Sequence, residues 1–159
     1  MDMSKKIIMA LVSTAACACA SAATTHNALD KSFLQDAATA NQKEISLSKQ
    51  ALTQASSADV KTFANTMIND HTRLANSMKN LDPSVSASGD ADADGLGNTS
   101  GVAFDKAYMD AMVADHDKVV SRFESVASDP QYSADVRSAA KQALPTLKRH
   151  DAMAKSLDA

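Results

Sequence analysis

The chain has 159 residues, of which 16 are basic and 19 are acidic, so its formal net charge is −3. Aromatic residues make up only 4% of the sequence. Together with the dispersed basic residues, this excludes a nucleic-acid groove and a base-stacking platform. The length suffices for one domain with one hydrophobic core.

Residues 1–22 have the layout of a secretory signal peptide. Two lysines precede an apolar stretch at 7–18, and residues 20–22 form an A-x-A cleavage pattern. The apolar stretch is shorter than the about 20 residues that a membrane span requires. We therefore expect an exported protein, periplasmic or attached to the outer membrane, with no transmembrane span in the mature chain and a flexible N-terminus at 23–29.

Both cysteines, Cys17 and Cys19, lie within this expected signal peptide. Its removal would leave a chain with no disulfide and no thiolate metal ligand. Acylation of Cys17 or Cys19, which would make the protein a lipoprotein, is the alternative.

The rest of the chain repeats its apolar residues with a period of 3.5 to 3.6, which is typical of helices. The pattern predicts four helices, at residues 30–55, 58–81, 103–127 and 133–157. Ser57 and Ser133 are expected to cap the second and fourth helices, because a serine oxygen can accept a free amide of the first turn.

An internal repeat and a long linker predict the topology. The sequence SADVK at 57–61 recurs as SADVR at 133–137, each time opening the second helix of a pair. The linker 82–102 can reach ~66 Å at ~3.3 Å per residue, whereas its neighbouring helices are only about 36 Å long. We therefore predict an all-α, ferritin-like antiparallel four-helix bundle at 30–159, built from two helical hairpins with a long crossover linker.

Each predicted helix carries one polar residue in its apolar seam: Glu44, His71, His116 and His150. Burying such a group without a partner costs a few kcal/mol. Imidazole and carboxylate are ligands for iron, zinc, copper or manganese, so the pattern predicts a metal site in the bundle core. The alternative is a hydrogen-bonded core, in which the histidines donate to backbone carbonyls or to Glu44.

Two methionines precede these histidines by four residues and lie on the same helix faces. Met67 opens the sequence MINDH, which ends at His71, and Met112 opens MVADH, which ends at His116. A thioether ligand would favour copper(I), although methionine beside such residues is more often core filler.

Positions along the helices rank the four candidates. Glu44, His71 and His116 are expected within about one turn of each other, and His150 roughly 9 Å higher at 1.5 Å per residue. A direct ligand role for His150 is therefore the weakest. Pro145 is expected to interrupt the fourth helix.

The remaining polar residues near the seams are not expected to bind a metal directly. Asp70, Asp115 and Asp151 each flank a histidine by one position and are expected in solvent, with a contact to a histidine ring as the minority interpretation. His26 is expected in a frayed end.

The linker holds a weak calcium candidate, Asp90, Asp92 and Asp94. With Gly95 these residues match the first half of a calcium loop. The position that should supply a bidentate glutamate is Gly101, so a solvated acidic linker is the favoured interpretation.

Several motifs resemble those of a bacterial family called domain of unknown function 4142. They are FLQDAA at 33–38, ANQKE at 40–44, MINDH at 67–71, MVADH at 112–116 and LPTLKRH at 144–150. The resemblance covers about 30–157 and implies a ferritin-like bundle with an exported or outer-membrane address, but no established activity. Di-iron ferritin-like proteins carry Glu-x-x-His on two helices, a pattern that this sequence lacks.

Three hypotheses follow. The first is an exported protein that binds a transition metal, such as copper, iron or zinc, in the bundle core. The second is a non-catalytic envelope or stress-associated protein with a hydrogen-bonded histidine core, acting as a homo-oligomer or with an envelope partner. The third and least favoured is a di-metal oxidase.

Overall fold

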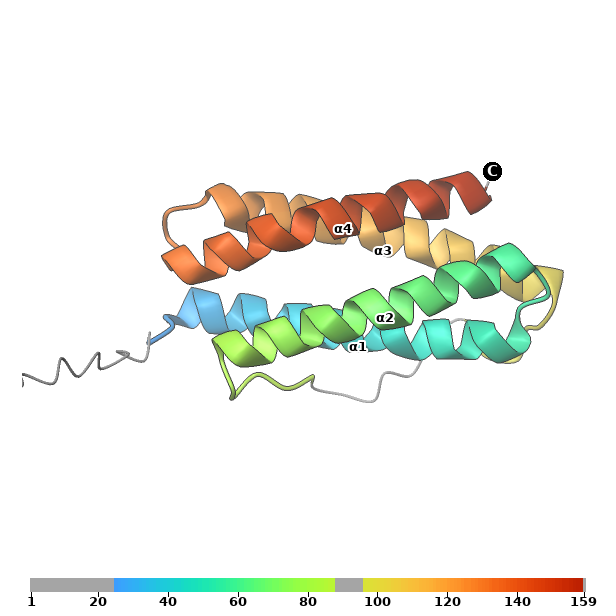
Figure 1. Cartoon of the computed structure of the whole chain (residues 1–159), viewed down its shortest axis with the longest axis horizontal. Coiled ribbons are helices and arrows are strands. Elements are labelled where there is room, and N and C mark those ends of the chain that lie inside the picture. Colours follow the sequence, from blue (N-terminus) through green and yellow to red (C-terminus); the bar gives the residue numbers. More distant parts are fainter. Residues whose placement is uncertain (1–24, 88–95, 159) are drawn as a thin grey trace, which may run out of the picture.

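The computed structural model describes residues 25–87 and 96–158, which form a four-helix bundle (Figure 1). The helices are α1 Ala28–Gln54, α2 Ala58–Leu81, α3 Val102–Ser128 and α4 Ala134–Asp158. These bounds confirm the all-α prediction, because each observed helix begins and ends within two residues of the expected one. The expected signal peptide with its two cysteines and the calcium candidate at 90–94 lie outside the described residues.

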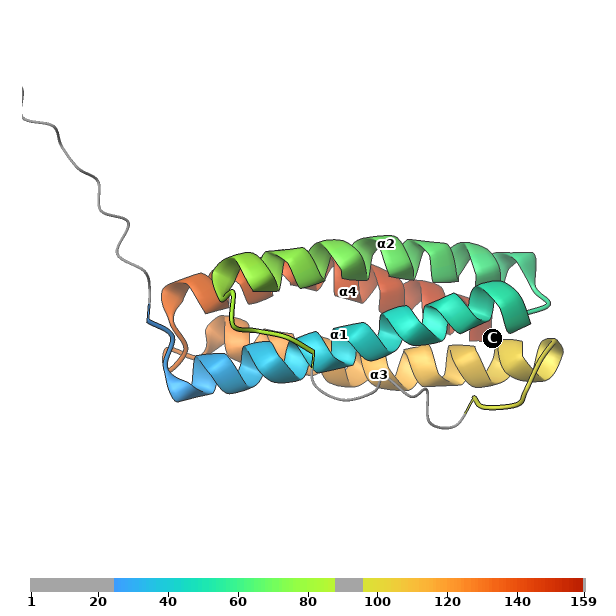
Figure 2. The ribbon, with the colours of Figure 1, turned by 90° about the horizontal axis from the view of Figure 1, so that it is seen from below.

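The bundle has the crossover topology, with α2 parallel to α3 and α1 parallel to α4 (Figures 1 and 2). At one end, the Gly101 N–H before α3 donates to the Gln54 carbonyl at the end of α1, at 2.8 Å. At the other end, the Ser133 N–H before α4 donates to Asp30 Oδ1 in α1, at 2.9 Å. The end of α2 and the start of α3 therefore lie at opposite ends of the bundle.

Local chemistry explains where the helices begin. Ser57 caps α2 as expected, its hydroxyl accepting the Val60 N–H at 3.4 Å. Ser133 lies at the expected position, but its hydroxyl donates to Asp135 Oδ1 at 2.6 Å instead of accepting an amide. The expected interruption at Pro145 does not occur, since α4 continues through it. Proline removes one helix hydrogen bond and leaves the remaining ones to hold the helix together.

The core consists of two apolar clusters with a polar layer between them. One cluster contains Leu47, Met67, Met112 and Ala154 among its members. The other contains Phe33, Met78, Phe123 and Leu147. In chain order, Glu44, His71, His116 and His150 each fall between the two clusters on their helix and are at most 3% exposed. Every helix therefore contributes one buried polar group to the same layer.

His26 is buried, contrary to the expectation of a frayed N-terminus. Its Nε2 lies 3.2 Å from Asp135 Oδ2, and its Nδ1 lies 3.4 Å from Asp82 Oδ2. The two carboxylates come from the start of α4 and the end of α2, so the ring joins three segments that are distant in sequence.

Among the described residues, no helix is both long and apolar enough to cross a membrane.

Candidate metal centre

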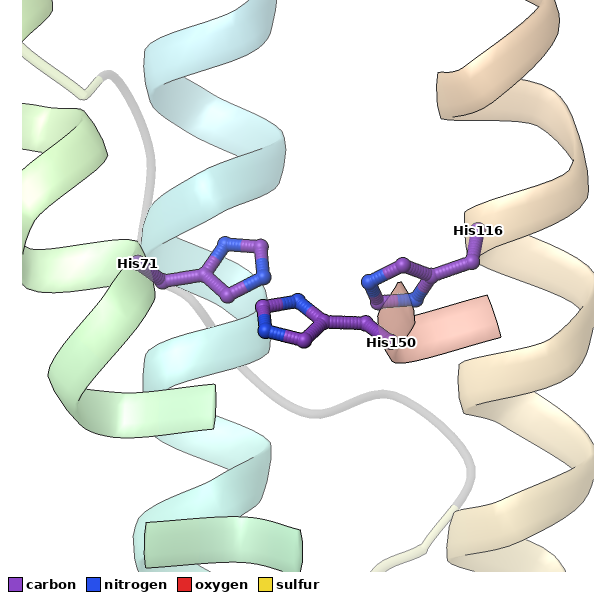
Figure 3. A group of neighbouring side chains, drawn as sticks. All are labelled: His71, His116 and His150. Carbon is purple, nitrogen blue, oxygen red and sulfur yellow. The ribbon is translucent and has the colours of Figure 1, made fainter. Parts of the chain in front are cut away.

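Three histidines from three different helices meet in the polar layer: His71 on α2, His116 on α3 and His150 on α4 (Figure 3). We call them the histidine cluster. Their ring centroids are separated by 5.2 Å (His71 to His150), 5.5 Å (His116 to His150) and 5.8 Å (His71 to His116). One ring nitrogen from each lies within 4.8 Å of the other two.

The proton of His116 is on Nδ1. This nitrogen lies 2.9 Å from the carbonyl oxygen of Met112, one turn earlier on α3. A carbonyl oxygen can only accept a hydrogen bond, so Nδ1–H must be the donor. In a neutral ring, Nε2 then carries a lone pair and no proton.

The proton of His71 is also on Nδ1, which lies 2.8 Å from Asn41 Oδ1. The Asn41 amide nitrogen donates to the His71 carbonyl oxygen at 2.9 Å. This second bond orients the amide so that its oxygen faces the ring. His71 Nδ1–H therefore donates to Asn41, and Nε2 carries the lone pair.

His150 uses the opposite nitrogen. Its Nε2 lies 3.0 Å from Asp70 Oδ2, and a carboxylate accepts, so Nε2–H is the donor and Nδ1 carries the lone pair. The guanidinium groups of Arg73 and Arg149 donate to the same carboxylate, each at 2.6 Å. Asp70 was expected in solvent. The structure instead gives the minority interpretation, because α4 packs beside α2 and brings His150 to it.

The three lone pairs converge in the buried core (Figure 3). His71 Nε2, His116 Nε2 and His150 Nδ1 are buried and have no hydrogen-bond partner among the described residues. Neutral acceptors that face one another without a donor gain nothing from burial, and each loses its hydration. A cation bound between them would satisfy all three.

Burial keeps these rings neutral. Desolvation, with the neighbouring His150 and His116 rings, lowers the pKa of His71 to about 3. Desolvation is also the main reason that the pKa of His116 falls to about 4. The pKa of His150 is lowered by burial as well, against the opposing pull of Asp70. Neutral imidazole is the form that binds metals.

Glu44 lies behind the histidine cluster rather than within it. Its Oε2 is 3.1 Å from His71 Nδ1, and its Oε1 is 3.7 Å from His116 Nδ1. These are the protonated nitrogens, on the side of the rings opposite the lone pairs. Burial, and secondarily the charge of Asp115, raises the pKa of Glu44 to about 8. The observed geometry therefore does not bear out the expected ligand role for Glu44.

The expectation that His150 lies too high is wrong. His150 is sixteen residues after the first residue of α4, and Glu44 is sixteen after the first residue of α1. The two helices are parallel and start at the same end of the bundle, so the two residues reach the same level. The error came from counting the helices from different ends.

The other candidates lie around the cluster. Met67 and Met112 are fully buried in the neighbouring apolar cluster, as core filler would be. Asp115 accepts from Lys43 at 3.2 Å, and Asp151 accepts from Lys155 at 2.8 Å. Sequence reasoning missed Asn41, although its position three residues before Glu44 puts it on the same helix face.

Fold and site together define a class of protein: a helical bundle with a tri-histidine cluster buried at its centre. The chain belongs to the family described as "Domain of unknown function (DUF4142)", whose model matches residues 15–157. This match confirms the resemblance noted from the motifs. No curated protein and no solved structure matches the chain.

Proposed function

We propose that this protein binds one divalent transition-metal ion in its core, through His71 Nε2, His116 Nε2 and His150 Nδ1. The observation that carries the proposal is the convergence of three buried, unprotonated ring nitrogens. Metal-ligating histidines usually donate their other ring N–H to a carbonyl, a carboxylate or a similar acceptor, which fixes the tautomer. All three rings already have such an acceptor here.

Three imidazoles favour zinc, copper, iron or nickel over calcium or magnesium. A tetrahedral zinc ion with bonds of about 2.0–2.1 Å needs ligand nitrogens about 3.3 Å apart. The nitrogens of the histidine cluster lie within 4.8 Å of one another, so small ring movements would close the site. Three protein ligands leave a fourth position open, as in zinc sites that accept an external ligand.

Metal content of the untagged mature chain tests this proposal. We expect about one zinc or copper ion per chain after loading and dialysis, with nitrogen scatterers near 2.0 Å in X-ray absorption spectra. His116→Leu should lose the ion. The matched control is His26→Gln, which alters the fourth histidine of the chain and should retain it. Failure to retain zinc, copper, iron or nickel would refute the proposal.

The second candidate function is a metal-free structural bundle with a hydrogen-bonded histidine core. The bonds from the rings to Asn41, Met112 and Asp70 favour it, because each histidine is already half satisfied. Under this alternative, added metal and chelator leave the melting temperature unchanged. A metal-binding protein is instead stabilised by RT ln(1 + [L]/Kd).

We also propose that the protein is exported and acts outside the cytoplasm. The proposal is supported by the basic, apolar and A-x-A pattern of residues 1–22. Cell fractionation and N-terminal sequencing test it, with Ala23 expected as the first residue of the mature chain. A cytoplasmic protein that retains residues 1–22 would contradict it.

A further inference from the structure

A groove of about 620 Å³ is lined mainly by residues of α2 and α4. One end is formed by His71 and His150 of the histidine cluster. The other end reaches Leu81, the last residue of α2, and Asp135 in the first turn of α4. The eleven residue-to-residue steps of α2 from Asp70 to Leu81 correspond to about 16 Å. The groove has the volume of a site for a small organic molecule, which is about 300–1,000 Å³.

The walls of the groove are mainly apolar. They include Phe33, Leu74, Met78, Phe123, Ala140 and Leu147. Polar side chains such as Ser77 and Gln142 also contribute. An elongated apolar molecule bound there would remove both this surface and its own surface from water. Such burial contributes about 25 cal/mol of favourable free energy per Å² of apolar area.

The end of the groove at the histidine cluster has balanced charges when no metal is bound. Asp70 and Arg73 both line this end and form an ion pair. Arg149 also binds Asp70 but is not among the residues that line the groove. His71 and His150, which line the same end, are neutral and each has an unpartnered lone pair among the described residues.

The proposed metal would make this end of the groove favour an anion. The ligand set of three neutral imidazoles contains no carboxylate among the described residues. The charge of a divalent ion in an apolar core is costly unless an anion offsets it. An anion in the open fourth position would do so, and the groove already extends to two of the three ligands.

We infer that the groove binds an apolar monocarboxylate of the fatty-acid type, whose carboxylate completes the coordination of the metal. This inference rests on the proposed metal site. The apolar walls hold the chain, and the metal, with Arg73 beside it in the lining, holds the head group. No bond is formed or broken in the ligand.

Cobalt(II) provides the readout, because its visible spectrum reports both its own binding and a change of ligand. The full mature chain is loaded with cobalt and titrated with decanoate below its micelle concentration. Decanol has the same chain without the charge, and acetate has the same head group without the chain. We expect decanoate to change the spectrum and to bind at least about a hundredfold more tightly than either, since each buried methylene adds several-fold.

A pair of variants on α4 locates the binding. Ala143→Phe fills the groove, which Ala143 lines. Ala152→Phe makes the same change at an exposed position outside it. Both variants should bind cobalt, but only Ala143→Phe should lose decanoate.

Each failure has its own signature. Cobalt binding with no spectral response to decanoate overturns the groove inference and leaves the metal site intact. Equal binding of decanol, equal binding of acetate, or unchanged decanoate binding in Ala143→Phe also overturns it. Absence of cobalt binding overturns the metal site and this inference with it.

Discussion

Replacing His116 with leucine separates a metal ligand from a structural histidine. His116 is fully buried, and its Nε2 has no partner among the described residues. The carbonyl of Met112 also accepts the helical N–H of residue 116, so losing the ring leaves no new unpaired group. The His116→Leu variant thus removes one unsatisfied buried nitrogen.

The magnitude follows from two opposing contributions. Removing the unsatisfied nitrogen stabilises the metal-free protein by about 1–3 kcal/mol, and losing the bond to Met112 costs about 1 kcal/mol. We expect the free energy of unfolding to stay equal or to rise by up to about 2 kcal/mol. At about 4 °C per kcal/mol, this is a rise in Tm of up to about 8 °C.

The free energy of unfolding is measured by urea unfolding followed by circular dichroism, once with chelator and once with excess zinc. The wild type should gain about 2.7 kcal/mol from zinc at 100 times its Kd, whereas His116→Leu should gain nothing. Met109→Leu is the matched control: a buried apolar swap on α3 that costs less than about 1.5 kcal/mol and keeps the zinc effect. If His116→Leu lost more than about 2 kcal/mol in chelator, the ring would be structural and the reasoning wrong.

Further predictions concern pH and the residues around the cluster. Stability of the metal-free protein should peak between about pH 6.5 and 7. Since the pKa values of His71 and His116 are lowered to about 3 and about 4, the unfolded chain binds more protons below 6.5, and stability falls as the pH falls. The pKa of Glu44, raised to about 8, acts oppositely from pH 4.5 upward. These two histidines outweigh Glu44 up to 6.5, and His150, whose pKa is also lowered by burial, acts in the same direction, so stability declines with rising pH only above about 7. Urea midpoints between pH 4.5 and 8 measure this curve, and a steady rise to pH 8 would contradict it. Glu44→Gln should flatten the decline above about pH 7 while retaining the metal. Asp70→Asn should weaken metal affinity by about 10- to 100-fold in a competition titration. Asp117→Asn is the control, because it also removes a carboxylate that accepts from a basic residue, and it should leave metal affinity unchanged. Equal losses of metal affinity in the two variants would refute the role of Asp70.

The helices and the layer of polar groups were determined by the sequence. Apolar periodicity locates α2 at its observed bounds, because helix formation follows from short-range spacing. The same periodicity identifies Glu44, His71, His116 and His150 as inward-facing, since a residue in an apolar seam must be buried with it. The long linker predicts the crossover from its length alone.

Only the tertiary structure decided which of these groups form the site. Counting residues from a common end of the bundle gives the heights of His150 and Glu44, but whether each side chain faces the others depends on how the helices pack and how the side chains are oriented, which counting does not give. The tautomers of the three rings depend on Asn41, Met112 and Asp70. Asn41 and Asp70 each lie on a different helix from the ring that they orient. The spacing of residues along one helix determines which of its side chains face the core. The convergence of the three lone pairs additionally requires that three helices pack together.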